Sequence, residues 1–179
     1  MGGRFILGCI TAAALALVAE WGSSRDSLES KAKTSFSDSL GTSARRFEMQ
    51  LPNGTYDTID LSRRTALILV FSHDCRGCDL NMPRWLDLIV AARSAMVPVY
   101  ALGVGEIASE AEYWTGLHAQ ARVGTVDTEV LTSGMRVNST PTTLVLRNGA
   151  VVARRIGVLG EHDRAELGGI LASRSSESR

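Results

Sequence analysis

Between residues 47 and 172 the chain alternates short apolar runs with longer amphipathic stretches, a pattern that predicts strands and helices in turn. The run 66–71 is unbroken, which is typical of a strand covered on both faces of a sheet. After it, apolar residues recur at helical spacing and predict a helix over 79–93. The members of this apolar stripe are Met82, Trp85, Leu86, Ile89 and Ala92.

The same pattern continues toward the C-terminus. Residues 97–103 predict another strand, and 123–126 a short one. Between them, Ser109 and Glu112 have capping-box spacing, which predicts that a helix starts at Ser109. The residues expected to face inward from this helix are Ala111, Trp114, Leu117 and Ala121.

Two turn signals predict β-hairpins. Asn148 and Gly149 separate strand-like runs over 142–147 and 150–156. Residues 52–54, Pro-Asn-Gly, separate runs over 47–51 and 55–61, and residues 161–172 predict a closing helix. The order is a hairpin followed by β–α–β–α–β–β–α. It predicts an α/β domain with helices on both faces of a parallel-type sheet that ends in an antiparallel hairpin.

The N-terminal segment has a different composition. Residues 5–19 are uncharged and mostly apolar, and they lie between Arg4 and Glu20. The stretch is shorter than the about 20 residues that a spanning helix needs, and it suits the apolar region of a signal sequence. Residues 14–16 offer a small-x-small cleavage site. Alternatively, residues 2–21 form an uncleaved anchor, with an aromatic residue at the interface.

The anchor is favoured because Leu17 spoils the last cleavage site, which would follow Ala19. Both interpretations place the rest of the chain outside the cytoplasm, because the early positive charge precedes the apolar run. The predicted organisation is an anchor or signal over 1–21, a Ser-rich linker over 22–46, a domain over 47–173 and a tail over 174–179.

Composition and charge narrow the function. Hydrophobic residues make up 45% of the chain and charged residues 21%, so a sizeable core is expected. Lysine plus arginine equals aspartate plus glutamate, at 19 each, and no basic patch interleaved with aromatic residues is seen. A nucleic-acid partner is therefore not expected.

Two cysteines, Cys75 and Cys78, stand between the unbroken strand and the helix that follows it. This places Cys75 just before or at a helix N-terminus, where free N–H groups and the helix dipole favour a thiolate. Since the thiolate is the form that attacks disulfides, the pair predicts a redox site. A zinc site needs further ligands, and the remaining Cys9 and the three histidines stand at unrelated spacings. No metal and no cofactor are expected.

The stretch 47–172 resembles the thioredoxin superfamily and, within it, the TlpA/ResA-like membrane-tethered thiol–disulfide oxidoreductases. The cysteine pair carries part of the resemblance, with Pro83 five residues after the second cysteine. The segment 139–149 is similar to the family's cis-proline segment and final hairpin, and 47–54 to the branch's added hairpin. The resemblance implies an α/β thioredoxin-like fold, a central mixed sheet flanked by helices, with an extra N-terminal β-hairpin.

The resemblance also implies roles at the site. Cys75 is expected to attack, and Cys78 to be buried and to resolve the mixed disulfide. The Thr140–Pro141 peptide is expected to be cis, leaving a backbone edge that pairs with an extended substrate segment. Thr140 would supply its carbonyl and N–H group there.

Supporting roles fall to neighbouring residues. Arg76 places a cation beside the thiolate or is simply solvated, and Asp74 acts in the opposite direction. Gly77 is expected to let the backbone turn tightly into the helix. Pro83 kinks that helix or marks its first turn. His73 is a candidate proton relay, with a solvent-facing loop position as the alternative.

The sequence also departs from the family. Asn81 stands where the reductase branch carries a glutamate, and Leu69 where thioredoxin has a buried aspartate. Asp74 replaces the tryptophan that often precedes the first cysteine. In the family a buried acid shuttles the proton of the second cysteine. His73 and Asp79 are candidates to substitute for it, with a solvated position as the alternative for both.

The leading hypothesis is an exported enzyme that exchanges disulfides with protein substrates, as a reductant fed by a membrane electron donor. Maturation of a c-type cytochrome or of a cofactor enzyme would be its context. The expected location is the bacterial inner membrane, with a single-pass anchor in the lipid bilayer through residues 2–21 and the domain in the periplasm. A cleaved, soluble periplasmic form is the alternative.

Two other functions stay open. A peroxiredoxin-like thiol peroxidase fits the S-x-x-C spacing of Ser72 and Cys75, although Ile68 stands where that family has a proline. A copper-delivery module usually has C-x-x-x-C and a late histidine, which the segment 136–147 lacks.

Overall fold

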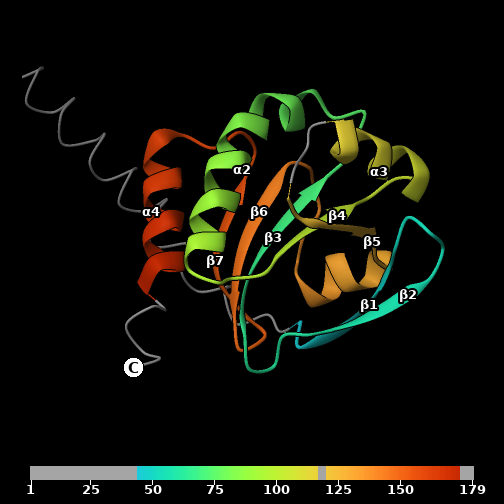
Figure 1. The fold of residues 1–179 in the computed structure, drawn as a ribbon, viewed down its shortest axis with the longest axis horizontal. Coiled ribbons are helices and arrows are strands. Elements are labelled where there is room, and N and C mark those ends of the chain that lie inside the picture. Colours follow the sequence, from blue (N-terminus) through green and yellow to red (C-terminus); the bar gives the residue numbers. More distant parts are fainter. Residues whose placement is uncertain (1–43, 117–119, 174–179) are drawn as a thin grey trace, which may run out of the picture. The chain divides into compact units, whose positions relative to one another are not determined.

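The computed structural model describes residues 44–116 and 120–173, which form one twisted sheet with helices packed on it (Figure 1). The elements in chain order are β1 (Arg46–Gln50), β2 (Tyr56–Asp60), β3 (Thr65–Phe71), α2 (Arg76–Ser94), β4 (Val99–Gly103), α3 (Ile107–Gly116), β5 (Arg122–Thr125), the π-helical turn η1 (Val130–Gly134), β6 (Thr142–Arg147), β7 (Ala150–Ile156) and α4 (Glu161–Ala172).

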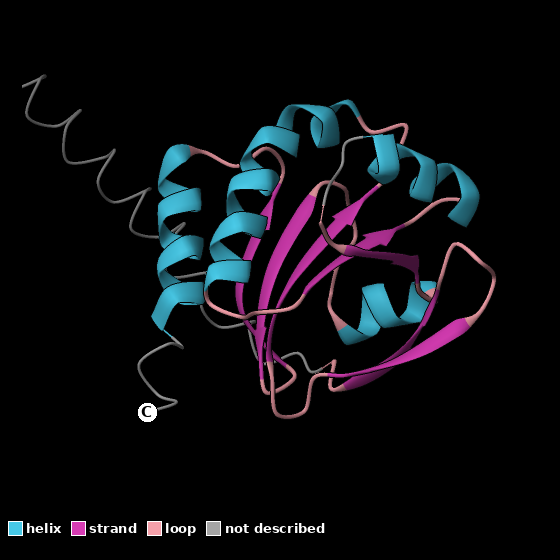
Figure 2. Cartoon of the chain, viewed as in Figure 1, coloured by secondary structure: helices cyan, strands magenta, loops and turns pink. Residues whose placement is uncertain are grey.

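The strands form a single mixed sheet in the order β2-β1-β5-β4-β3-β6-β7 (Figure 2). Strand β4 pairs in parallel with both β3 and β5. On the other side of β3, β6 pairs antiparallel with β3, and β7 pairs antiparallel with β6. The hairpin β1–β2 extends the opposite side through a short antiparallel pairing of β1 with β5. The predicted α/β class, with a mixed sheet and an added N-terminal hairpin, is confirmed.

Strand β3 lies at the centre, and every one of its side chains is buried. Its residues alternate between two apolar cores, because successive side chains of a strand point to opposite faces. Leu67, Leu69 and Phe71 join the core beneath α2, α3 and α4. Their neighbours Ala66, Ile68 and Val70 join a second core, covered by η1 and the residues that follow it. This double burial explains the unbroken apolar run.

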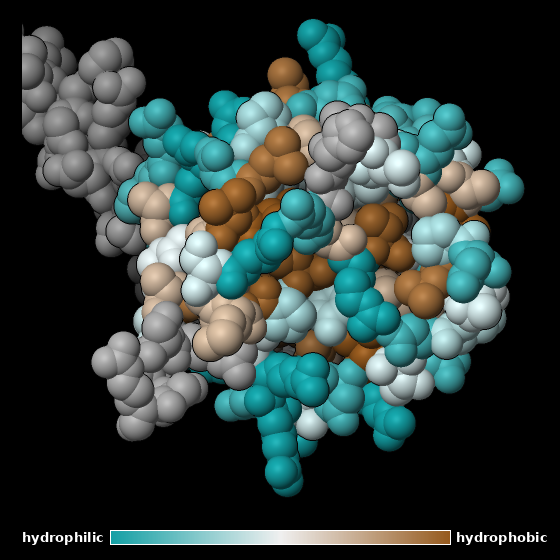
Figure 3. All heavy atoms as spheres, in the orientation of Figure 1, coloured by the Kyte–Doolittle hydropathy of each residue, from teal (hydrophilic) through white to brown (hydrophobic). Residues whose placement is uncertain are grey.

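The helix after β3 is longer than predicted and has a slightly different inner face. It begins at Arg76 instead of residue 79 and continues past Pro83 to Ser94. Leu88 is buried where Leu86 was expected, and Leu86 lies partly in solvent. Helix α4 packs beside α2 over the same face of the sheet (Figure 1). Figure 3 shows apolar side chains gathered toward the middle of the face in view, with hydrophilic ones around them.

The predicted start of α3 is wrong. The helix begins at Ile107, and Ser109 lies within its first turn, so Ser109 is not the N-cap. The capping-box spacing to Glu112 therefore has no capping role. Trp114 is buried as expected, whereas Ala111 is only partly buried. The predicted contact of Leu117 lies outside the described residues.

The late hairpin is confirmed. Asn148 and Gly149 both have positive φ, at 53° and 78°, the conformation that a two-residue hairpin turn requires. The strands on either side, β6 and β7, and the closing helix α4 have the predicted bounds. The short strand predicted over 123–126 is β5, displaced by one residue, and η1 was not predicted.

The predicted anchor or signal over 1–21, Cys9 and the tail over 174–179 lie outside the described residues. Most of the predicted linker does too, although β1 begins at Arg46 and Ala44 is already buried. The backbone N–H of Ala44 donates to the carbonyl of Gly149, 2.8 Å away. Within the described part of the chain, no helix is both long and apolar enough to cross a membrane.

Candidate active site at the start of helix α2

Cys75 is the N-cap of α2, directly after the turn that follows β3. Its backbone N–H donates to the carbonyl of Ser72 at 3.1 Å, which closes this turn. Its sulfur accepts a hydrogen bond from the backbone N–H of Cys78 at 3.3 Å. The predicted position at a helix N-terminus is therefore confirmed, and the site lies where parallel strands of an open sheet end.

The two thiols have different surroundings. Cys75 is partly exposed, whereas Cys78 is fully buried in the core beneath α2. Burial acts to raise the pKa of Cys75. Hydrogen bonds from the side chains of Cys78 and Thr140 and from the backbone at Cys78 and Gly77 outweigh it, so the pKa lies below its usual value. Burial, followed by the hydrogen bond with Cys75, raises the pKa of Cys78 to about 12. Of the two thiols, Cys75 therefore forms the thiolate more readily.

The Thr140–Pro141 peptide is cis, as predicted. Pro141 is buried and lies against the first turn of α2. A Cβ atom on Gly77 would stand 3.0 Å from Cδ of Pro141 and 3.8 Å from the sulfur of Cys75. The cis-proline segment, Gly77 and the outer thiol therefore meet at one place, although the proline follows the cysteine pair by many residues.

The predicted reason for Gly77 is wrong. It lies inside α2 and has no positive φ, so its backbone conformation is open to any residue. The limited space is what favours glycine, because a side chain would press on the proline ring. Arg76 is exposed, and within residues 44–116 and 120–173 it makes no ion pair. Pro83 lies inside α2 on its exposed side, away from the first turn.

His73 is held by a residue that the sequence did not indicate, the fully buried Glu110 of α3. One carboxylate oxygen accepts the backbone N–H of His73 at 2.9 Å, and the other lies 3.2 Å from its ring Nδ1. The ring Nε2 is 3.2 Å from the carboxylate of Asp74. The hydrogen bond to Glu110, ahead of the opposing effect of burial, raises the pKa of His73 above its usual value.

A sequence signal for Glu110 did exist. It precedes the buried Trp114 by four residues, so the two share a helix face. The capping-box spacing indicated Ser109 and Glu112 instead. No side chain fits at the two glycines beside the carboxylate: a Cβ on Gly103 or Gly105 would lie 2.6 or 2.4 Å from Glu110 atoms.

Asn81, which replaces the expected glutamate, is also fully buried. Its side-chain oxygen accepts the backbone N–H of Leu159 at 2.9 Å, and its amide nitrogen donates to the carbonyl of Gly157 at 3.5 Å. Gly157 in turn donates its N–H to the carbonyl of Pro141 at 2.8 Å. Asn81 therefore connects α2 to the loop that supports the cis-proline.

Leu69 and Asp79, the other two positions discussed for a buried acid, have different surroundings. Leu69 is buried in the core beneath the helices. Asp79 is exposed and accepts a hydrogen bond from the hydroxyl of Tyr113 on α3 at 2.9 Å. Helix α3 thus contacts the chain on both sides of the cysteine pair, through Glu110 before it and Tyr113 after it. Among the described residues, no three His, Cys, Asp or Glu side chains cluster as metal ligands would.

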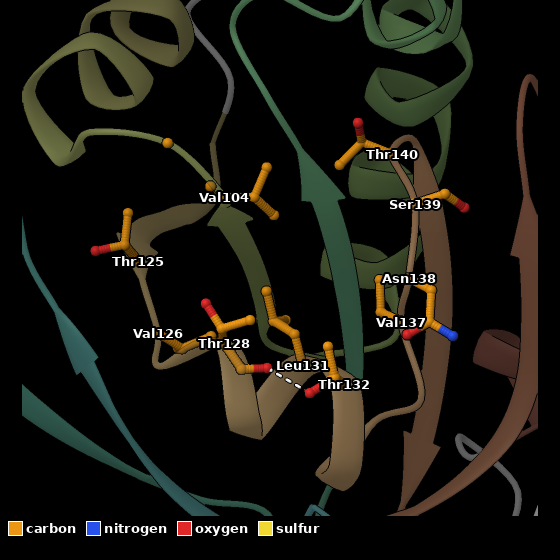
Figure 4. A pocket seen from close by; sticks show the side chains of 12 residues that line it. Val104, Thr125, Val126, Thr128, Leu131, Thr132, Val137, Asn138, Ser139 and Thr140 are labelled. Carbon is orange, nitrogen blue, oxygen red and sulfur yellow. Dashed lines mark hydrogen bonds between the residues drawn. The ribbon is translucent and has the colours of Figure 1, made fainter.

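A groove of about 550 Å³ runs along the segment that precedes the cis-proline (Figure 4). One wall comes from residues 137–140 and the other from the ends of β4 and β5 and from η1. In Figure 4, Val104, Thr125 and Thr128 lie across from Ser139 and Thr140. The lining is uncharged, mostly with apolar and hydroxyl-bearing side chains, and it reaches Thr140, whose side chain acts to lower the pKa of the outer thiol.

The fold is similar to those of several solved thiol–disulfide proteins. A Chlorobium tepidum protein assigned as the thiol:disulfide interchange protein DsbE matches with a TM-score of 0.63 and 17% identity, over 75% of this chain and 97% of its own. The thioredoxin domain of a Bacteroides vulgatus thiol-disulfide oxidoreductase matches with a TM-score of 0.62 and 12% identity, over 75% and 99%. The fold is the thioredoxin fold.

A secreted Mycobacterium tuberculosis disulfide oxidoreductase, homologous to DsbE of E. coli, matches with a TM-score of 0.55 and 14% identity, over 71% of this chain and 95% of its own. No protein-family model and no curated protein sequence matches the chain. At these identities the likeness concerns the thioredoxin fold alone.

Proposed function

We propose that the protein exchanges thiols and disulfides with protein substrates through Cys75 and Cys78. The observation that carries this proposal is the contrast between the two thiols. The outer one is partly exposed with a lowered pKa, and the inner one is buried with a pKa of about 12. Such a pair suits an attacking and a resolving cysteine.

In the reducing direction, the Cys75 thiolate attacks one sulfur of a substrate disulfide. An S–S bond to the substrate forms, and the substrate's other sulfur leaves as a thiolate. Cys78 then loses its proton and attacks the sulfur of Cys75, which releases the second substrate thiolate. The protein ends as the Cys75–Cys78 disulfide, and two electrons have passed to the substrate. The oxidising direction is the reverse of these steps.

The substrate would bind as an extended segment at Thr140. Among the described residues, the backbone N–H and carbonyl of Thr140 have no backbone partner, because β6 begins two residues later. The carbonyl of Pro141 is already bonded to Gly157. A free backbone edge of this kind pairs with another chain by strand addition. The groove along residues 137–140 would hold the part of the substrate beside its cysteine.

Exposed apolar side chains around the site support a protein substrate. Leu80 follows the cysteines on α2, Val104 follows β4, and Ile156 and Val158 flank Gly157 beside the cis-proline. Each is between 44% and 59% exposed, in the range of side chains that a partner could cover. A small oxidant such as hydrogen peroxide would need no such surface.

Mixed-disulfide trapping tests the function. Cys9 is replaced by Ala in every variant, so that only the pair can react. Cys78→Ser should accumulate a covalent adduct with its substrate, which is visible without reductant and lost with it, because the resolving thiol is absent. Cys75→Ser is the matched control and should form none.

Absence of an adduct from Cys78→Ser, together with rapid consumption of hydrogen peroxide by the wild type, would replace this proposal with a thiol peroxidase. Tight binding of one Cu(I) without disulfide turnover would replace it with copper delivery.

We further propose that the domain works outside the cytoplasm. Residues 2–21 would tether it to the bilayer, and a membrane electron donor would keep it reduced for maturation of a c-type cytochrome or a cofactor enzyme. Support comes from the charge order at the N-terminus, with Arg4 before and Glu20 after the apolar run. A reporter that is active only after export, fused after Arg179, should be active. Activity of only a cytoplasm-dependent reporter would contradict this location.

A further inference from the structure

The loop that carries Cys75 is fastened to α3 by a buried carboxylate. Glu110 has no exposed surface, and both of its oxygens face the same residue, His73. One oxygen accepts the backbone N–H and the other approaches the ring, at 2.9 and 3.2 Å. A buried carboxylate is costly unless it is paired and hydrogen-bonded, and His73 supplies both kinds of partner.

His73 lies close to the nucleophile along the chain. Two residues span at most about 7 Å between Cα atoms, which is shorter than the distance over which physiological salt screens a charge. The loop is also closed on itself by the hydrogen bond from the N–H of Cys75 to the carbonyl of Ser72. A charge on His73 is therefore carried within a few residues of Cys75, on the same closed loop.

We propose that Glu110 is a positioning residue for disulfide exchange: it fixes the loop that carries Cys75 and holds His73 as a cation that favours the Cys75 thiolate. The inference rests on the proposed function, and it gives a buried acid of this chain a role other than the proton shuttle that Asn81 and Leu69 do not provide. His73 would then be neither a free loop residue nor an isolated proton relay.

The surrounding charges agree with this assignment. The groups acting on His73 are Glu110 on α3, Glu106 just before that helix and Asp74 beside it in the loop, and all three favour the protonated ring. When the ring loses its proton, these carboxylates are left without that cation, and an added negative charge at Cys75 becomes less favourable. The titrations of His73 and Cys75 are therefore coupled.

The experiment follows both groups without any disulfide substrate. The pKa of His73 is measured by NMR in the reduced full-length protein, and the rate at which iodoacetamide alkylates Cys75 is measured against pH. In the wild type, the pKa of His73 should lie above its ordinary value of 6.5. Glu110→Gln, which retains an acceptor for the backbone N–H, should lower the proton affinity of His73 by about tenfold or more.

His73→Gln should move the alkylation profile to higher pH, so that Cys75 reacts at least about threefold more slowly at pH 7. His162→Gln is the matched control, since that ring is exposed on α4 and paired only at 3.9 Å with Glu166. It should change neither readout.

Two results would each overturn the proposal. The first is a wild-type His73 with a pKa at or below 6.5, a measurement that does not depend on any variant folding. The second is that the alkylation profiles of His73→Gln and wild type coincide. Iodoacetamide reacts with the thiolate and needs no substrate. This inference can therefore fail while substrate trapping succeeds, and substrate trapping can fail while this inference holds.

Discussion

Replacing Asn81 by Asp tests whether this position supports the fold of the site or its chemistry. The substitution preserves shape. One carboxyl oxygen would still accept the N–H of Leu159, but the other would face the carbonyl oxygen of Gly157, where the amide now donates. A protonated carboxyl group restores that donor, whereas an ionised one places two oxygens against each other in a fully buried position.

The size of the effect follows from linkage. Burial raises the pKa of such a carboxyl group in the folded state above the about 3.9 of an unfolded aspartate. The folded state then holds the proton more tightly, so the variant is near wild-type stability below about pH 4 and loses stability as pH rises toward the folded pKa. The slope is at most about 1.4 kcal/mol per pH unit, which gives a loss of up to about 4 kcal/mol by pH 7.

Urea unfolding of wild type and Asn81→Asp from pH 4 to 7 measures this difference. Asn138→Asp is the control, because Asn138 is exposed and should show little pH dependence. A difference between Asn81→Asp and wild type that stays constant over this range would refute the reasoning. It would mean that the carboxyl group is solvated and that Asn81 does not fasten the loop after β7.

Three further outcomes are expected. At pH 7, iodoacetamide should label Cys75 and leave Cys78 unmodified in the folded protein, as mass spectrometry of peptides will show, because the buried thiol has a pKa of about 12. Thr140→Val should move the alkylation profile of Cys75 to higher pH, since the Thr140 side chain acts to lower the pKa of Cys75. Thr140→Ser should restore the profile, and coincident profiles for Thr140→Val and wild type would exclude this effect. Thr143→Val should cost about 1–3 kcal/mol in urea unfolding, because the buried ring N–H of Trp85 loses its acceptor at 2.8 Å, and an unchanged midpoint would contradict that hydrogen bond's contribution.

Local sequence signals predicted the late hairpin correctly and the start of α3 wrongly. The hairpin at Asn148 and Gly149 formed as expected because its turn requires positive φ at two adjacent positions. For α3, the local signal was the capping-box spacing at Ser109, and it predicted the wrong start. A capping box is also a local pattern, and in this chain the helix begins earlier.

The sequence by itself determined that a cysteine pair opens a helix after a buried strand, because this feature rests on residues that are close together in the chain. The cis-proline segment was expected from the resemblance to the thioredoxin superfamily. Only the tertiary structure decided which groups surround those thiols. It brings Pro141 against Gly77 and places Glu110 on His73, 37 residues away, while Asn81 supports a loop 78 residues further on. Such contacts depend on the packing of α2, α3 and the sheet, and no periodicity or local motif specifies them, because these patterns relate only residues within a few positions of each other.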